Sequence, residues 1–456
     1  MRLVLFKNTI LILSLAFFSC GSTYTETNEG DEGTLNDIIQ VGEAITADAQ
    51  RDKDRAKKKT LLEMEVGSLE EVGSLNNNII TGAEQPGVYF PLLNNKKVGV
   101  VANQTSVIIE NLATFEEGQP GNNKIIKTHI VDYMSTNAIT ITKVFAPEHG
   151  FRGTADAGEV VKDGIDTQTG LPIISLYGNN KKPSKAQLEG IDIMVFDIQD
   201  VGARFYTYIS TLHYVMEACA EQGIPLLILD RPNPNGHYID GPILEPKHAS
   251  FVGMHPVPVV HGMTIGEYAQ MINGEKWLAN GVTCDITIIK NEGYTHKTAY
   301  SLPVNPSPNL PNTIAISLYP SLCFFEGTFV SAGRGTNMQF QVFGAPSLPE
   351  RFYDFTFTPQ SNEGSKSPKF KGEVCHGKDL RNYPQLESLN LDWLIEAYVA
   401  NGKKKDFFNS FFTKLAGTET LQEQIEQGYT AREIKKTWQE GLKAYEKMRK
   451  GYLLYE

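Results

Sequence analysis

The sequence lacks the short motifs that build most cofactor, metal and nucleophile sites. No G-x-G-x-x-G follows the first predicted strand and no P-loop is present, so a dinucleotide or ATP site has little support. The nine histidines include no H-x-H or H-E-x-x-H, and no G-x-S-x-G marks a serine nucleophile. We therefore expect no cofactor and no metal, and acid–base chemistry by carboxylates is what remains.

Cysteine and clustered positive charge are also scarce. Four cysteines remain when Cys20 is set aside, and no C-x-x-C suggests a zinc or redox site. Their even number permits disulfides, but Cys219 and Cys323 lie in apolar stretches, where a free thiol behaves as a small hydrophobic side chain. The net charge is −11 and the basic residues are scattered, which argues against a nucleic acid partner.

No apolar run is long enough to be a good membrane span, and residues 1–20 have the pattern of an export signal. Arg2 and Lys7 precede a short apolar core, residues 9–18. Cys20 follows a small residue, as in a lipobox, so we expect a lipoprotein signal peptide and lipidation of Cys20. A plain secretory signal is the alternative, because the two preceding phenylalanines fit a lipobox loosely. The expected location is the cell envelope, anchored only through the lipid and facing the periplasm or cell surface.

The fold class follows from short apolar runs that begin after residue 83. Residues 21–82 are polar and are expected to form a flexible tether. Beyond them, apolar runs end in polar or glycine-rich turns, at residues 98–101, 139–145, 173–177, 191–198 and 225–229. Such runs, alternating with helices, indicate a parallel sheet that is covered on both faces. We predict an α/β fold, with a Rossmann-like, mostly parallel sheet domain over residues 83–255 and a helix at 207–223.

Residues 256–456 contain helices and fewer strands, and are expected to form a smaller α+β domain. Thr430 and Glu433 form a capping box that begins a final helix, whose predicted buried stripe is Ile434, Trp438, Leu442 and Tyr445. Thr264 and Glu267 form another capping box, which assigns Glu267 to helix structure.

Three predicted strands end in polar clusters, and ligands of open parallel sheets bind beyond the carboxyl ends of the strands. Glu148 follows the strand at 139–145, between Pro147 and His149. Burial of a carboxyl group in a partly apolar cleft favours its protonated form, which suits a general acid. A helix cap or a salt bridge to Arg152 is the structural alternative.

The other two strand ends permit both structural and catalytic interpretations. Asp197, Gln199 and Asp200 come at the end of one strand, where turn and capping chemistry competes with catalysis. Arg204 can grip a substrate carboxylate or pair with either aspartate. The same two interpretations apply to the cluster after the next strand, which contains Asp230, Arg231 and Asn233.

Taken together, these motifs resemble the exo-β-N-acetylmuramidases of bacteria, a glycoside hydrolase family long carried as a domain of unknown function. The resemblance covers about residue 83 to the C-terminus. It rests on P-E-H-G-F-R-G (147–153) with D-A-G-E (156–159), D-I-Q-D (197–200) with R-F-Y-T-Y (204–208), D-R-P-N-P (230–234) and G-R-G-T (333–336). The resemblance implies that the second domain closes an interdomain cleft, where terminal β-1,4-linked N-acetylmuramic acid is hydrolysed from peptidoglycan fragments without a cofactor.

The resemblance also implies roles for individual residues. Glu148 matches the family's proposed catalytic glutamate and would protonate the leaving oxygen. The second catalytic group stays open among Asp197, Asp200, Asp156, Glu159 and the substrate's own acetamido group. An arginine is the expected reader of the lactyl carboxylate, and the candidates are Arg204, Arg231 and Arg334, in that order. The other expected substrate contacts are His149, Arg152, Asp156, Glu159, Gln199, Tyr206, Asp230 and Asn233.

Three other functions remain open at this point. An envelope lipoprotein could capture muropeptides without cleaving them, and a β-N-acetylglucosaminidase could use the same carboxyl group on another sugar. A nucleotide-using enzyme on the Rossmann-like sheet is the weakest of the three.

Overall fold

The computed structural model describes residues 79–114, 122–153 and 163–456. The expected signal peptide, Cys20, nearly all of the tether, and both Asp156 and Glu159 lie outside these residues. The described residues belong to the compact unit Ser68–Glu456. None of the helices in this part of the chain is both long and apolar enough to cross a membrane.

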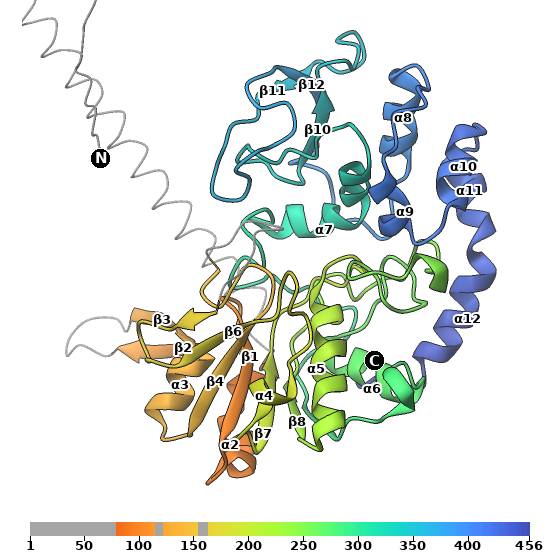
Figure 1. The fold of residues 1–456 in the computed structure, drawn as a ribbon. Helices are drawn as coiled ribbons and strands as arrows, with labels where there is room; N and C mark the ends of the chain where they lie inside the picture. The colour runs from red at the N-terminus through yellow and green to blue at the C-terminus, as the bar shows by residue number, and fades with distance from the viewer. Residues whose placement is uncertain (1–78, 115–121, 154–162) are drawn as a thin grey trace, which may run out of the picture. The chain divides into compact units, whose positions relative to one another are not determined.

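A seven-stranded sheet forms the N-terminal half (Figure 1). Its order is β5-β6-β4-β1-β7-β8-β9, and all neighbours are parallel except β5 and β6. The six strands from β6 to β9 follow the 3-2-1-4-5-6 order of doubly wound dinucleotide-binding sheets, which confirms the predicted fold class. The strands are β1 (Val98–Ala102), β4 (Ile141–Ala146), β5 (Gly164–Ile165), β6 (Pro172–Ser175), β7 (Ile193–Asp197), β8 (Leu226–Leu229) and β9 (Ile286–Ile289).

Both faces of the central strands are buried, because successive side chains of β1 and β7 enter different cores. Val101 of β1 and Phe196 of β7 are partners in the sheet and face one core, whereas Val100 and Val195 face the other. Helices α5 and α6 contribute to the first core, and α2 and α3 to the second (Figure 1). The helices of this half are α2 (Pro86–Leu93), α3 (Ile130–Thr136), α4 (Lys185–Leu188), α5 (Tyr208–Gln222) and α6 (Ile265–Gly274), with short 3-10 turns η1 (Gly82–Glu84), η2 (Pro246–His248) and η3 (Ala279–Gly281).

Two strand segments of the N-terminal half do not follow from the apolar runs. A hairpin of β2 (Val107–Thr114) and β3 (Asn122–His129) stands beside the sheet and pairs only with itself. Strand β9 pairs with β8 and therefore extends the sheet beyond residue 255. It is an edge strand with one buried residue, Ile289, so its sequence carries no continuous apolar run.

The C-terminal half combines a small antiparallel sheet with helices. Its strands are β10 (Val342–Ala345), β11 (Phe355–Phe357) and β12 (Cys375–Asp379), in the order β10-β12-β11. Its helical segments are α7 (Thr313–Leu322), η4 (Cys323–Gly327), α8 (Asp392–Ala400), α9 (Ser410–Ala416), α10 (Thr420–Glu426), α11 (Ala431–Thr437) and α12 (Gln439–Arg449).

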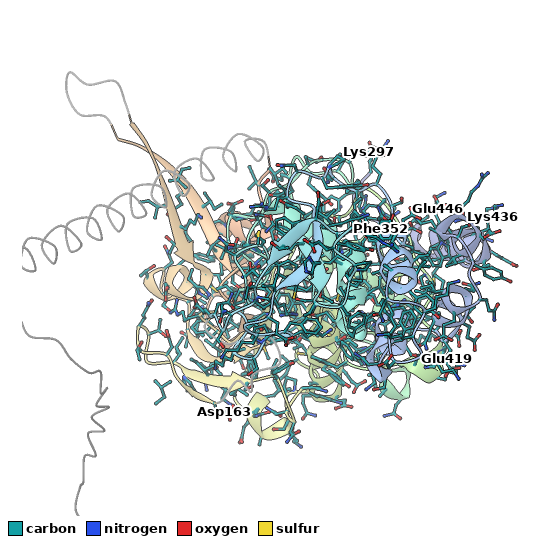
Figure 2. The ribbon with its side chains drawn as sticks, turned by 90° about the horizontal axis from the view of Figure 1, so that it is seen from above. Asp163, Lys297, Phe352, Glu419, Lys436 and Glu446 are labelled. Atoms are coloured by element: carbon teal, nitrogen blue, oxygen red, sulfur yellow. The ribbon has the colours of Figure 1, made fainter. Side chains whose placement is uncertain are left out.

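The final helix differs from its prediction in one respect. The capping box of Thr430 and Glu433 is present and the predicted stripe is buried, but the helix is interrupted at Trp438. Trp438 ends α11 and caps α12. Lys436 of α11 and Glu446 of α12 lie at the outer edge of the molecule, opposite the buried stripe (Figure 2).

Candidate active site

A cavity of about 870 Å³ is lined by residues from both halves of the described structure. The N-terminal half contributes residues that follow the carboxyl ends of β4, β6 and β7, among them Glu148, Tyr177 and Thr207. The C-terminal half contributes Glu326 and Arg334. The volume lies in the upper part of the range for small-molecule pockets.

Glu148 lies at the wall of this cavity and is half-buried. Thr207 Oγ1 donates a hydrogen bond of 2.7 Å to Glu148 Oε2. Burial together with the nearby Glu148 carboxylate raises the pKa of Tyr177, so its hydroxyl group remains protonated. Residue His149 has a φ of 70°, a left-handed conformation that costs a non-glycine residue about 1–2 kcal/mol. Such strained backbone concentrates at ligand-binding sites.

Asp197 and Arg231 lie together in the core rather than at the cavity wall. Arg231 Nε donates to Asp197 Oδ1 at 2.6 Å and Nη2 donates to Oδ2 at 2.9 Å. Nη2 also donates to the carbonyl oxygen of Val107, and both side chains are almost fully buried. Asp197 ends β7 and Arg231 follows β8, so this ion pair joins the carboxyl ends of two neighbouring strands.

Asp200 and Gln199 serve the turn after β7. Asp200 Oδ2 accepts the backbone N–H of Gly202 at 2.7 Å and lies 3.6 Å from His261 Nε2. Gln199 Nε2 donates to the carbonyl oxygens of Asp200 and Pro232. Both side chains are buried and neither lines the cavity.

Arg204, the leading candidate for carboxylate recognition, is fully buried. Its guanidinium donates four hydrogen bonds to backbone carbonyl oxygens, those of Pro242, Val257, Leu415 and Ala416. Burial without a carboxylate partner lowers the pKa of Arg204 to about 9. Because two of these carbonyls belong to α9, Arg204 joins the two halves of the molecule instead of facing the substrate space.

Asp230 and Asn233 hold the start of α6. Asp230 accepts hydrogen bonds from Thr264 Oγ1, the Gly266 N–H and the Tyr455 hydroxyl, and Asn233 Nδ2 donates to the carbonyl oxygen of Met263. Burial raises the pKa of Asp230 to about 6, although these bonds oppose the shift. Neither residue lines the cavity.

The remaining expected contacts divide between the cavity and its surroundings. Arg152 forms salt bridges of 2.9 Å with Asp132 and 2.8 Å with Asp166. Tyr206 lines the cavity and donates to the carbonyl oxygen of Pro306 at 2.8 Å. His149 and Arg334 also line the cavity.

The cavity wall that the C-terminal half contributes was largely missed by reasoning from the sequence. Arg334 Nη2 donates to Glu326 Oε2 at 3.0 Å, and Arg334 Nε contacts Glu326 Oε1. Glycine residues next to Glu326 and Arg334 mark these loops in the sequence, but nothing there pairs the two charges. Phe251 also lines the cavity, and the Lys181 ammonium lies 4.6 Å from its ring centroid. Phe251 belongs to none of the sequence motifs. In the described lining, cationic side chains outnumber carboxylates, since Lys181, Lys366, Lys414 and Arg334 face Glu148 and Glu326. The cavity therefore suits an anionic ligand.

No cluster of three or more histidine, cysteine, aspartate or glutamate side chains that could hold a metal ion occurs in the described part of the chain. The four cysteines there are free and buried, as expected of small hydrophobic side chains.

Comparison with known proteins identifies the family. The N-terminal profile of exo-β-N-acetylmuramidase NamZ matches residues 98–314, and the C-terminal profile matches residues 317–455. The chain belongs to the NamZ family. This membership confirms the resemblance that the motifs indicate, and the two family profiles meet near residue 315.

Relatives of the NamZ family match over most of their length. The chain is 37% identical over 386 residues to the peptidoglycan β-N-acetylmuramidase NamZ of Bacillus subtilis, covering 80% of this chain and 89% of that protein. Crystal structures of two DUF1343 family proteins from Bacteroides fragilis have TM-scores of 0.73 and 0.68, with identities of 46% and 26%. Each comparison covers 83% of this chain and 99% of the crystallised chain.

Proposed function

We propose that this chain is an exo-acting glycoside hydrolase that releases N-acetylmuramic acid from the non-reducing end of peptidoglycan fragments, with Glu148 as the general acid. The observation that carries this proposal is the position of the Glu148 carboxyl group. It lies half-buried at the wall of the cavity, with Thr207 Oγ1 2.7 Å from Oε2. Family membership and the β-N-acetylmuramidase from B. subtilis support the choice of sugar.

In the proposed reaction, Glu148 donates its proton to the glycosidic oxygen as the bond to the anomeric carbon breaks. The hydroxyl group of Thr207 fixes the orientation of the carboxyl group. A carboxyl group fixed in this way is already aligned with the leaving oxygen when the substrate binds, which lowers the entropic part of the barrier.

The proposal is tested with purified protein and 4-nitrophenyl N-acetyl-β-muramide. On N-acetylmuramic acid β-1,4-linked to N-acetylglucosamine, whose leaving sugar hydroxyl must be protonated, we expect Glu148→Gln to lower kcat by at least about 100-fold, because removal of a general acid typically costs 10²- to 10⁴-fold. Glu440→Gln, a change of the same kind at an exposed position on α12, should leave the rate unchanged.

The same experiment distinguishes the alternative functions. If wild type binds the muramide without releasing nitrophenol, the chain is a binding protein. If wild type hydrolyses the corresponding N-acetylglucosaminide equally well, the proposed specificity for N-acetylmuramic acid is wrong. Retention of activity on the disaccharide in Glu148→Gln would contradict the role of this residue.

We also propose that Cys20 carries a lipid that holds the enzyme in the cell envelope. This rests on the sequence pattern of residues 1–20. Fatty-acid labelling of the expressed full chain tests it, since wild type should be labelled and Cys20→Ser should not.

A further inference from the structure

Arg334 is the arginine that lines the cavity among the described residues. It lies in the loop before β10, and its guanidinium stacks over the ring of Phe340 at 5.2 Å. The side chain retains 23% of its exposure, unlike the fully buried Arg204 and Arg231. An arginine that is supported on one side and open on another can bind a ligand without a large loss of side-chain entropy.

The contacts of Arg334 leave a defined edge of the guanidinium for a ligand. Glu326 occupies the edge formed by Nε and Nη2. A guanidinium has five N–H donors in a planar fork, so the edge formed by Nη1 and the other N–H of Nη2 remains. Within the described residues, Nη1 makes no hydrogen bond to protein. That free edge has the geometry for bidentate binding of one more carboxylate.

The charge of Glu326 has a second consequence. Burial alone would lower the pKa of Arg334, but the adjacent carboxylate more than offsets this and keeps it above its usual value. Arg334 is therefore a permanent cation in the cavity. Glu326 also fixes the plane of the guanidinium, because two contacts to one edge prevent rotation about the Cδ–Nε bond.

We propose that Arg334 binds the lactyl carboxylate of the substrate through its free edge, and that Glu326 is a positioning residue that holds Arg334 in this orientation. This inference rests on the proposed function, because it names the group that reads the sugar at the same site. Discrimination between acidic and neutral sugars then depends on one interaction. The lactyl carboxylate accepts hydrogen bonds from the free edge of Arg334, whereas a neutral sugar leaves these buried N–H donors without a partner.

The test compares two substrates that differ only in charge, 4-nitrophenyl N-acetyl-β-muramide and its lactyl carboxamide. Wild type is expected to prefer the acid in kcat/KM by at least about tenfold. Arg334→Gln should lower kcat/KM for the acid by about 10- to 100-fold and leave that for the carboxamide within about twofold. Arg334→Lys keeps the positive charge but lacks the planar pair of N–H donors, so most of the loss in kcat/KM for the acid should persist.

Arg351→Gln is the matched control. Arg351 also lies over a phenylalanine, Phe352, at 4.6 Å in the C-terminal half, but Arg351 is exposed and outside the cavity. It should behave as wild type on both substrates. Thermal unfolding of every variant shows whether a loss of activity reflects loss of fold.

The role of Glu326 is read from the direction of change in KM. If Glu326 acted only as a negative charge, Glu326→Gln would bind the acid more tightly and KM would fall. If it positions Arg334, the glutamine loses one of two contacts, and KM for the acid should rise about three- to tenfold with kcat little changed. Glu350→Gln, an exposed position beside Arg351, is its control.

The outcomes separate this inference from the proposed function. If wild type hydrolyses neither substrate, the proposed function fails. If wild type hydrolyses both equally, or Arg334→Gln keeps the preference for the acid, the function stands and the inference about Arg334 is overturned. A lower KM for the acid in Glu326→Gln overturns the positioning role of Glu326.

Discussion

Among the described residues, the Thr207 hydroxyl group donates a hydrogen bond to the Oε2 atom of Glu148. Thr207 is also the N-cap of α5, but its side chain makes no capping bond there. Its hydroxyl can therefore be removed without uncapping the helix. We expect Thr207→Val to lower kcat by about 10- to 100-fold, the loss associated with a hydrogen bond to a charged group, with KM nearly unchanged.

A conservative variant distinguishes this role from a structural one. Thr207→Ser keeps the hydroxyl group and should behave as wild type, whereas Thr207→Val should not. Equal rates in both variants would exclude the proposed role.

Individual residues also show where reasoning from sequence ends. The place of Glu148 at the cavity wall could be predicted, because a polar residue after a buried strand lies at the edge where ligands bind. Arg204 and Arg231 also follow buried strands in the sequence. In the structure, however, Arg204 donates to backbone carbonyl oxygens and Arg231 donates to Asp197. Which partner each arginine meets depends on segments far away in the chain, and a local pattern does not contain that information.

At the level of elements, the central strands follow from sequence because both of their faces are buried. The runs at 98–101 and 191–198 become β1 and β7, and the helix predicted at 207–223 is α5. Elements with one exposed face were harder. Strand β9 and the β2–β3 hairpin are amphipathic or polar and resemble loops when read alone, and their pairing is decided by neighbours.

Gly223 gives a test of one element boundary. It ends α5 in the left-handed conformation, with a φ of 66°, and a Cβ atom added there would meet nothing within 4 Å. Gly223→Ala should therefore destabilise the protein by about 1 kcal/mol through backbone strain alone. Gly87 is the matched control, because its Cβ position in α2 is also open but its backbone is helical.

Gly87→Ala should stabilise the protein by a few tenths to about 1 kcal/mol, since alanine loses less backbone entropy in a helix. Urea unfolding measures both free energies. If the two substitutions change stability in the same direction, the left-handed end of α5 is not what requires glycine at position 223.

At the scale of the whole molecule, the end of the chain fastens the C-terminal half to the sheet. The Tyr455 hydroxyl donates to Asp230 at 2.7 Å, and Glu267 accepts the N–H of Leu454 at 2.8 Å. The C-terminus consequently lies beside α6 (Figure 1). Glu267 was assigned to helix structure from its capping box, which is present, but its second role in binding the chain end was not visible in the sequence.

Stability against acid is a property of the whole molecule to which buried histidines contribute. His129 caps α3 through Nδ1, which accepts the N–H of Val131, while Nε2 lies 2.9 Å from the carbonyl oxygen of Asn103. Burial lowers the pKa of His129 to about 4. The folded state therefore excludes a proton that the unfolded chain binds below about pH 6.5, so stability is lost as the pH falls from about 6.5 to 4.

His129→Asn tests this contribution, because asparagine remains a good N-cap but does not titrate. Between pH 7 and pH 5, the free energy of unfolding of wild type should fall by roughly 2 kcal/mol more than that of the variant. Asp230, with its raised pKa, acts in the opposite direction over part of this range, but it is present in both proteins and cancels in the comparison. Urea unfolding at the two pH values gives the difference. Parallel pH dependence in the two proteins would mean that His129 accepts its proton in the folded state as readily as in the unfolded chain.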